Sequence, residues 1–370
     1  MARRVDDRSD RLDAYLADRD LAAVWFARPA SFAWLTGGDN VITASAPVGI
    51  AAAGYDGELR VVTDSIEGER LRAEEVPDGV DVETVSWHEG SLASAVETAS
   101  PEPAAADFDV PEFASVDATE LRQPLTADDV EAYRALGRDA ATAVEAACEA
   151  ASPTDTEADL ATAVRSRLAA ADARAPVLLV GGERRAQRYR HFTPTAAALD
   201  GYALVSVTAE SHGLHASLTR TVAVDPPAWF DERVDAARRV ETAALRATQS
   251  VGTRGGSAGD VFTAIKDAYA AVGVEGEWRH HHQGGAAGFA GREWIATPRA
   301  DHAVVLPMGY AWNPTVQGTK SENTWLVTEA GVEPLTGGDW GHRSVEPPQG
   351  VDREIAAEPL EHPVSVLDRR

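Results

Sequence analysis

Residues 202–224 read YALVSVTAESHGLHASLTRTVAV, and this stretch decides the fold. Residues 202–209 and 218–224 are mostly apolar and rich in valine and threonine, which is typical of strands. The serine and glycine of residues 211–213 favour a turn between them. The stretch therefore predicts two neighbouring strands joined by a short turn.

Helices are predicted on both sides of this strand pair, and they come in two pairs. The predicted helices are residues 127–151, a segment opened by a Thr154–Glu157 capping box, residues 228–250 and residues 259–272. Further strands are predicted at residues 176–181, 304–313 and 322–328. Because each pair of helices is followed by strands, we predict a domain built from two similar α/β halves around one curved sheet.

A smaller α/β domain is predicted over residues 1–120, because strands alternate with helices there. Its predicted strands are residues 21–26, 48–53, 59–63 and 80–85, and its predicted helices are residues 11–17, 31–37 and 64–73. Residues 100–106 are rich in proline, glutamate and alanine, which favours a surface loop or linker. The second domain is predicted over residues 121–338, and the Pro- and Glu-rich residues 339–370 are expected to form a mobile tail.

The chain of 370 residues is strongly acidic, with 59 acidic and 34 basic side chains and a formal net charge of −25. Only Lys266 and Lys320 are lysines. The acidity suits either a cationic partner or a surface adapted to a high-salt cytoplasm, and its even spread along the chain favours the second. The sequence has no basic stripe, so nucleic-acid binding is not expected.

A cytoplasmic protein without a membrane partner is also predicted. No apolar run reaches the roughly 18 residues that a membrane span needs, and the charged N-terminus lacks the apolar core of a signal peptide. Cys148 is the only cysteine, which excludes an internal disulfide and suits a reducing compartment. Its alanine-rich helical surroundings favour a small buried residue over a nucleophile.

Several motifs, taken in order, resemble those of the creatinase, prolidase and aminopeptidase P family. They are Trp34-Leu-Thr-Gly37, His191-Phe-Thr-Pro194, Thr219-Arg-Thr221, the segment from Gly284 to Glu293, the segment from Met308 to Pro314, and Ser321-Glu-Asn-Thr324. The resemblance implies a creatinase-like N-terminal α/β domain and a C-terminal pita-bread domain, in which helices flank a curved antiparallel sheet. It also implies a homodimer and a small-molecule or short peptide-like substrate.

The family's dinuclear metal site is built from two aspartates eleven residues apart, one histidine and two glutamates. At the matching positions this chain has Ser206, Ser217, Gly285, Asn313 and Glu322. Only Glu322 keeps a carboxylate, and two divalent cations need several anionic ligands. The comparison therefore implies that the family metal site is lost, so we expect no metal cofactor.

Four residues of the resembling motifs remain candidates for catalysis. His191 matches a histidine that helps to stabilise the tetrahedral intermediate in family peptidases and serves as acid and base in metal-free creatinase. His281 matches the histidine four residues before the lost ligand, while Glu293 and Glu322 match two family glutamates. We expect His191 to activate water and Glu322 to orient it or to bind a cationic group. The alternative is that His191 only satisfies a hydrogen bond at a strand end.

Other polar residues near these motifs are candidates for substrate binding. The predicted substrate-binding residues are Arg292, His212, His215, Asn313 and Trp312. Arg292 would bind a carboxylate, or it would pair with Glu293 or Glu322 and so replace the lost metal charge, and Lys320 has the same two options. The run from His280 to His282 is expected to alternate faces as a strand. A new metal site from His281, Glu322 and His212 or His215 is possible, but a polar pocket lining is favoured.

Three functions remain open at this stage. The first is a metal-independent hydrolase of a C–N bond in a small molecule or dipeptide-like substrate. The second is an Xaa-Pro aminopeptidase or dipeptidase with a rebuilt metal site. The third is an inactive relative that binds a ligand or a partner. Convergence of His191, His281, Glu293 and Glu322 on one pocket would favour catalysis.

Overall fold

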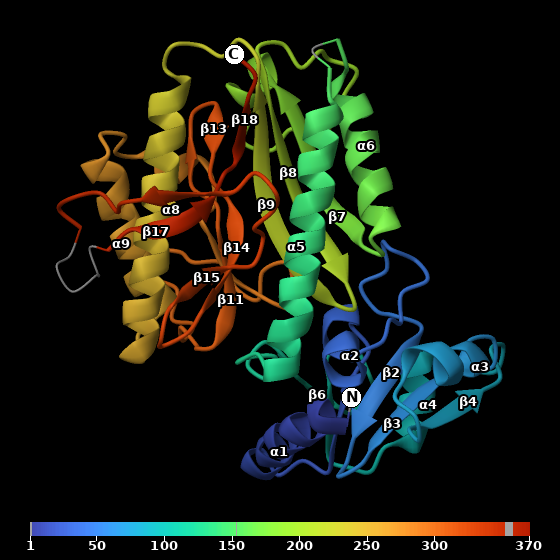
Figure 1. Cartoon of the computed structure of the whole chain (residues 1–370). Coiled ribbons are helices and arrows are strands. Elements are labelled where there is room, and N and C mark those ends of the chain that lie inside the picture. Colours follow the sequence, from blue (N-terminus) through green and yellow to red (C-terminus); the bar gives the residue numbers. More distant parts are fainter. Residues whose placement is uncertain (1, 153, 352–357) are drawn as a thin grey trace. The chain divides into compact units, whose positions relative to one another are not determined.

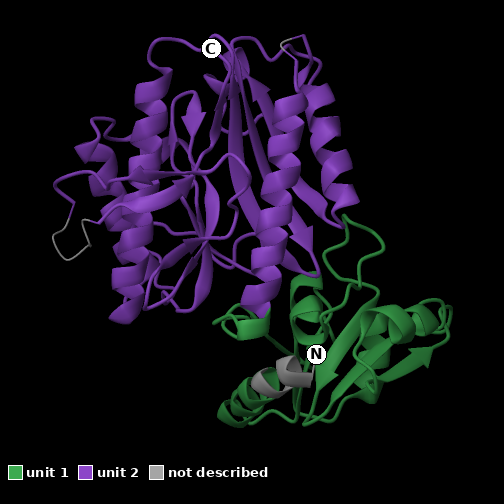
Figure 2. Cartoon of the chain, viewed as in Figure 1, with its two compact units in different colours: residues 1–128 green, residues 129–370 purple. Residues whose placement is uncertain are grey.

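The computed structural model describes residues 2–152, 154–351 and 358–370. The chain divides into two compact units, Met1–Asp128 and Asp129–Arg370 (Figure 2). The second unit thus begins a few residues later than the predicted residue 121. Within the described residues, no helix is long and apolar enough to cross a membrane.

The first unit is a six-stranded sheet with helices, in the strand order β4-β3-β2-β1-β5-β6. Its strands are β1 (Ala23–Phe26), β2 (Ala51–Tyr55), β3 (Leu59–Asp64), β4 (Asp81–Val85), β5 (Ala104–Ala106) and β6 (Ala114–Ser115). Its helices are α1 (Ala2–Asp18), α2 (Pro29–Thr36), α3 (Gly68–Arg70), the π-helix η1 (Leu71–Glu75) and α4 (Leu92–Ala99). The α/β prediction for this unit is confirmed.

Two local predictions for the first unit were wrong. Residues 100–106 were expected to form a loop, but β5 is buried and pairs in parallel with β1. Its three alanines carry little strand propensity, and Ala104 and Ala106 pack in the same core cluster as Trp25. The helix expected over residues 64–73 begins only at Gly68, because β3 runs through Asp64.

The second unit contains the two predicted helix pairs and their strands (Figure 1). Its helices are α5 (Ala127–Ala150), α6 (Glu157–Ala170), α7 (Glu183–Ala186), α8 (Phe230–Thr253), α9 (Ala258–Ala271) and the 3-10 helix η2 (Glu277–His280). Its longer strands are β7 (Arg174–Gly182), β8 (Tyr202–Ser211), β9 (Leu214–Ala223), β10 (Gly284–Ala287), β11 (Met308–Trp312) and β14 (Asn323–Val327). Short strands are β12 (Thr315–Val316), β13 (Thr319–Lys320), β15 (Val332–Pro334), β16 (His342–Val345), β17 (Leu360–Pro363) and β18 (Val366–Asp368).

Two four-stranded sheets form the centre of the second unit, in the orders β18-β9-β8-β7 and β10-β11-β14-β15. They meet where the N–H of Thr219 in β9 donates to the carbonyl of Glu322, at 2.9 Å. The N–H of Ser217 also donates to Thr324 Oγ1, at 2.7 Å. Figure 1 shows α5 and α6 beside the first sheet and α8 beside the second. This is the predicted pita-bread arrangement, and it brings residues far apart in sequence together along the β9–β14 junction.

The capping box at the start of α6 lies two residues later than predicted. Thr156 is the N-cap, and it exchanges hydrogen bonds with Asp159. The predicted partner, Glu157, is instead fully buried, where its carboxylate accepts the N–H groups of Gly182 and Thr195. Pro153 lies outside the described residues.

The last residues of the chain do not form the expected tail. β16 pairs with β17, and β18 pairs in parallel with β9. His362 of β17 is buried against α8, where its Nε2 lies 2.8 Å from Thr242 Oγ1. The pairing of β18 was hard to predict, because its partner β9 lies more than a hundred residues away in sequence. Residues 352–357 of the predicted tail lie outside the described residues.

Cys148 lies on the buried side of α5, as predicted. Burial raises the pKa of its thiol to about 12. A protonated, buried thiol is a poor nucleophile, so Cys148 is a packing residue.

Candidate active site

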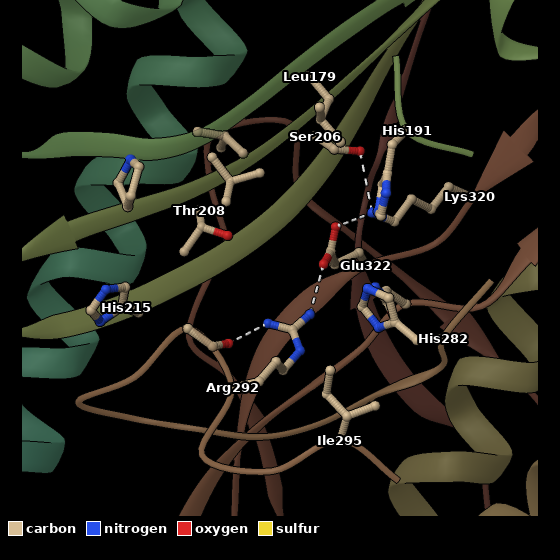
Figure 3. A pocket seen from close by; sticks show the side chains of 15 residues that line it. Leu179, His191, Ser206, Thr208, His215, His282, Arg292, Ile295, Lys320 and Glu322 are labelled. Atoms are coloured by element: carbon tan, nitrogen blue, oxygen red, sulfur yellow. Dashed lines mark hydrogen bonds and ion pairs between the residues drawn. The ribbon is translucent and has the colours of Figure 1, made fainter. Parts of the chain in front are cut away.

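A cavity of about 560 Å³ lies in the second unit, beside the β9–β14 junction (Figure 3). Strands β7 and β8 supply one wall, and loops before β8 and after β10 supply others. The charged and polar residues that line it include His191, Ser206, His282, Arg292, Lys320 and Glu322. The predicted site residues therefore gather largely, but not completely, in one pocket.

Glu322 lies at the centre of an ion-pair triad formed by Lys320, Glu322 and Arg292 (Figure 3). Glu322 Oε2 lies 2.7 Å from Lys320 Nζ. Glu322 Oε1 accepts a hydrogen bond from Arg292 Nη2 at 3.0 Å. Lys320 and Glu322 are two residues apart on an extended segment, so their side chains share a face. Each carboxylate oxygen thus has its own cation.

Two serines continue this triad into the first sheet. Arg292 Nη1 donates to Ser217 Oγ at 3.1 Å. Lys320 Nζ donates a longer hydrogen bond to Ser206 Oγ, at 3.4 Å. Each cation therefore lies between one serine and the shared carboxylate of Glu322. The predicted pairing of Arg292 and Lys320 with Glu322 is present.

The triad holds Glu322 in its ionised form. Burial alone would raise the pKa of this carboxyl group, since its side chain is only 6% exposed. The charges of Lys320 and Arg292 outweigh burial, and with a hydrogen bond from Thr219 Oγ1 they lower the pKa to about 2. One carboxylate thus faces two cations, which leaves a net positive charge on the triad.

Three histidines form a second group, the histidine cluster, made of His191, His281 and His282. Nε2 of His191 lies 3.1 Å from Nε2 of His281, and one ring nitrogen from each of the three histidines can be chosen so that all three lie within 4.8 Å of one another. Burial and the nearby Lys320 lower the pKa of His191. Burial, followed by neighbouring cations, lowers the pKa of His281 to about 2 and that of His282 to about 4. All three imidazoles are therefore neutral at pH 7.

The histidine run was expected to be a strand with alternating faces, and this was wrong. The 3-10 helix η2 ends at His280, and His281 after it is extended, with a φ of −156° and a ψ of 148°. The rings of His281 and His282 lie 4.4 Å apart between centroids, on the same side as His191. The glycine-bounded turn before η2 explains the difference, because Gly276 has a φ of 93° and starts the helix.

Gly285 and Asn313 lie near the cavity, on β10 and directly after β11. A Cβ atom at Gly285 would lie 2.1 Å from the carbonyl oxygen of Trp294 and 2.9 Å from its ring. Asn313 lines the cavity, and its Oδ1 accepts no hydrogen bond from any described residue. Position 285 therefore has no room for a side chain of any kind.

Replacing Gly285 by alanine is expected to destabilise the second unit by about 1–3 kcal/mol, because the new methyl group overlaps a backbone carbonyl. Chemical denaturation measures this loss. The matched control is Gly331→Ala, since a Cβ at Gly331 meets nothing within 4 Å. Equal stability of the two variants would contradict the packing at position 285.

Four predicted site residues are not part of the cavity lining, namely Trp312, Glu293, His212 and His281, and of these His281 lies against His191, 3.1 Å away between Nε2 atoms. Trp312 is fully buried, and its Nε1 donates to Thr248 on α8, so the prediction that it binds substrate was wrong. Glu293 is buried and accepts the N–H of Ala290 within its own loop. His212 lies in the exposed β8–β9 turn with a φ of 47°. His215 does line the cavity, and its Nδ1 lies 2.9 Å from the carbonyl of Gly213.

The sequence analysis missed Glu241, a residue of α8 that lies behind the ion-pair triad. It is fully buried and accepts hydrogen bonds from Asn323 N at 3.0 Å, Trp325 Nε1 at 2.8 Å and the hydroxyl of Ser321. These hydrogen bonds fix the position of the segment that carries Glu322, from the side opposite the triad. The available signal was an acidic residue among the apolar residues of a helix face, between Val240 and Ala244. Burial raises the pKa of Glu241 to about 7.

The sequence was compared with models of known protein families, and the model of metallopeptidase family M24 matches residues 131–329. This match covers more than half of the chain. The chain belongs to metallopeptidase family M24. A search of curated protein sequences gave no match.

Solved structures agree with the M24 fold. The prolidase of Pyrococcus furiosus matches 88% of this chain and 99% of its own, with a TM-score of 0.71 and 18% identity. The dipeptidase PepE of Mycobacterium ulcerans matches 99% of this chain and 98% of its own, with a TM-score of 0.67 and 18% identity. The N-terminal domain of the FACT complex subunit SPT16 from chickpea matches 90% of this chain and 96% of its own, with a TM-score of 0.62 and 11% identity. The M24 fold is thus found in proteins named as peptidases and in one named as a complex subunit.

Proposed function

We propose that this M24 chain hydrolyses a C–N bond in a small molecule or dipeptide-like substrate, without the two-metal centre of the family. The observation that carries this proposal is the ion-pair triad. Both oxygens of Glu322, the one matching ligand position that keeps a carboxylate, are engaged by Lys320 and Arg292. These two cations supply, within the protein, positive charge of the kind that metal ions would bring to the pocket.

The other matching positions do not fit a two-metal centre. Ser206 and Ser217 are neutral, and both are hydrogen-bonded, to Thr219 Oγ1 at 2.7 Å and to Thr208 Oγ1 at 2.9 Å. Gly285 offers no ligand atom and has no space for one. Asn313 offers a neutral oxygen in place of a carboxylate. Two divalent cations would add four positive charges to the two of Lys320 and Arg292, and the ligand positions offer one carboxylate, Glu322, to offset them.

His191 is the proposed acid and base. It lines the cavity, it is neutral at pH 7, and its Nε2 lies against the equally neutral His281. In hydrolysis, His191 would take a proton from water as the oxygen attacks the carbonyl carbon, and would return it to the leaving nitrogen as the C–N bond breaks. Spare N–H groups of Arg292 and Lys320 would stabilise the developing oxyanion or hold a substrate carboxylate.

Hydrolysis assays with a chelator present test this proposal. A panel of dipeptides and N-substituted small amides would be offered to the purified chain, with product amine as the readout. We expect turnover of at least one compound that EDTA leaves unchanged. Activity that appears only after addition of Mn²⁺ or Co²⁺ would contradict a metal-independent mechanism.

Replacing His191 by alanine is expected to lower this turnover by about 100-fold, because general acid–base catalysis contributes at least that much. The matched control is His280→Ala, since His280 is exposed at the end of η2 and lies outside the cavity lining. If the His191→Ala variant turns over substrate as fast as the wild type does, His191 has a purely structural role.

The second candidate is a catalytically inactive protein that binds a ligand or a partner, and one observation favours it. The charged groups of the triad already satisfy one another, as in a structural network. A panel in which no compound is hydrolysed, with or without metal, would favour a binding protein over a hydrolase.

A further inference from the structure

We propose that the histidine cluster is a binding site for one transition-metal ion of the zinc class, separate from the ligand positions of the M24 family. Its ligands would be His191, His281 and His282. The cluster is built from two parts of the chain, since His191 follows α7 and the other two follow η2.

The spacing of the rings fits one shared ion. Nitrogen ligands at 2.0–2.1 Å from a tetrahedral zinc ion lie about 3.3 Å apart, and their ring centroids about 5 Å apart. Nε2 of His191 and Nε2 of His281 are separated by 3.1 Å. The three centroid distances are 4.9, 5.9 and 4.4 Å. Small ring rotations would therefore bring three nitrogens onto one ion.

The chemistry of the cluster selects the kind of metal. Neutral imidazole is the most common protein ligand of zinc, and it also suits copper and nickel, whereas magnesium and manganese prefer carboxylate oxygens. His191 and His282 line the cavity. An ion held there would keep a coordination position open to water or substrate, as three-histidine sites commonly do.

The neighbouring charges permit a single ion. Lys320 and Arg292 both oppose a cation near the cluster, and the carboxylate of Glu322 offsets one of these two charges, so a single ion meets less repulsion than two ions would. Nδ1 of the buried His281 has no hydrogen-bond partner among the described residues. One hydrogen bond lies within the cluster, between Nε2 of His191 and Nε2 of His281, and an ion bound by both nitrogens would replace it.

The consequence for catalysis rests on the proposed function. A metal ion on His191 would occupy the lone pair that the proposed reaction uses as a base. Zinc would then inhibit metal-free hydrolysis rather than support it. Binding itself does not depend on that hydrolysis.

The experiment is a titration of the untagged, EDTA-treated chain with Zn²⁺ by calorimetry and with Co²⁺ by visible absorption. We expect about one ion per chain and the intense d–d bands of tetrahedral cobalt. His281→Asn and His282→Asn should each weaken Zn²⁺ binding at least about tenfold, because even outer-shell changes cost that much. The control His280→Asn should bind as wild type does.

Circular dichroism of each variant confirms that it is folded. No Zn²⁺ binding by the wild type, or equal binding by the His281, His282 and His280 variants, would overturn the proposal. Because the readouts are heat and cobalt absorption, they give the same answer whether or not the chain hydrolyses any substrate. Zinc binding without inhibition of a chelator-resistant activity would overturn only the inhibitory consequence.

Discussion

Replacing Glu322 by glutamine is expected to lower the free energy of unfolding by about 3 kcal/mol at pH 7. The carboxylate is the shared partner of Lys320 and Arg292, whose side chains are 5% and 14% exposed. A glutamine has one acceptor oxygen, so one of the two cations would face the NH₂ group of the amide, which cannot accept a hydrogen bond. Breaking a buried ion pair by removing one partner is strongly destabilising for this reason.

The same substitution should remove a pH dependence of stability. The pKa of Glu322 is about 2 in the folded chain, against an ordinary value of 4.5. Its stabilising contribution is therefore complete above pH 4.5 and is lost as the pH falls towards 2. Denaturant titrations of wild type and Glu322→Gln should converge over this acidic range.

An exposed ion pair supplies the control for Glu322. Glu333 pairs with Arg134 at 2.8 Å, and both side chains are more than 40% exposed. Glu333→Gln should cost at most about 1 kcal/mol, as surface pairs do. If Glu322→Gln proves no more destabilising than Glu333→Gln, the triad does not replace metal charge in the way we propose.

Replacing Glu241 by glutamine is expected to raise the free energy of unfolding by about 3 kcal/mol at pH 8 and to change it little at pH 4.5. Glutamine keeps an acceptor oxygen for Asn323 N and Trp325 Nε1, and it removes a buried negative charge. Burial raises the pKa of Glu241 from 4.5 to about 7. Its ionisation therefore costs stability progressively between pH 4.5 and 7, and the full cost persists above pH 7.

The control for Glu241 is a buried glutamate that has a cationic partner. Glu145 accepts a hydrogen bond from Arg220 Nε at 2.8 Å, with both side chains at most 2% exposed. Glu145→Gln should destabilise the chain at pH 8, because Arg220 would lose its counter-charge. A Glu241→Gln variant that is also destabilised at pH 8 would show that the ionised carboxylate is needed to hold the Glu322 segment.

The long elements of the second unit could be predicted from sequence because their patterns are local. The strand pair around residues 211–213 and the helix pairs carry clear periodicity, and the structure has them within a few residues. The C-terminal strands could not be predicted in this way. β18 is three residues long and pairs with β9, so its stability comes from a partner that no local pattern reveals.

In the site, too, the residues in local motifs could be predicted, and the contacts between distant parts of the chain could not. Resemblance at the motif level identified Ser206, Ser217 and Glu322. The ion pairs of Arg292 and Lys320 with Glu322 were one of two options that the sequence left open, and the structure has them. The pairing of His191 with His281 could not be predicted, because it depends on how two loops ninety residues apart fold onto each other. Trp312 was predicted to bind substrate and is fully buried instead, since an aromatic residue suits a pocket and a core equally well.

The most direct test of the account is the manganese content of the chain after equilibration with excess Mn²⁺ and removal of free metal. Manganese favours carboxylate-rich sites and binds imidazole more weakly than zinc does, so it reports on the M24 ligand positions rather than on the histidine cluster. With Lys320 and Arg292 engaging Glu322, we predict less than roughly 0.1 manganese ion per chain. A content near two ions per chain would contradict the account and would place a working metal centre in this pocket.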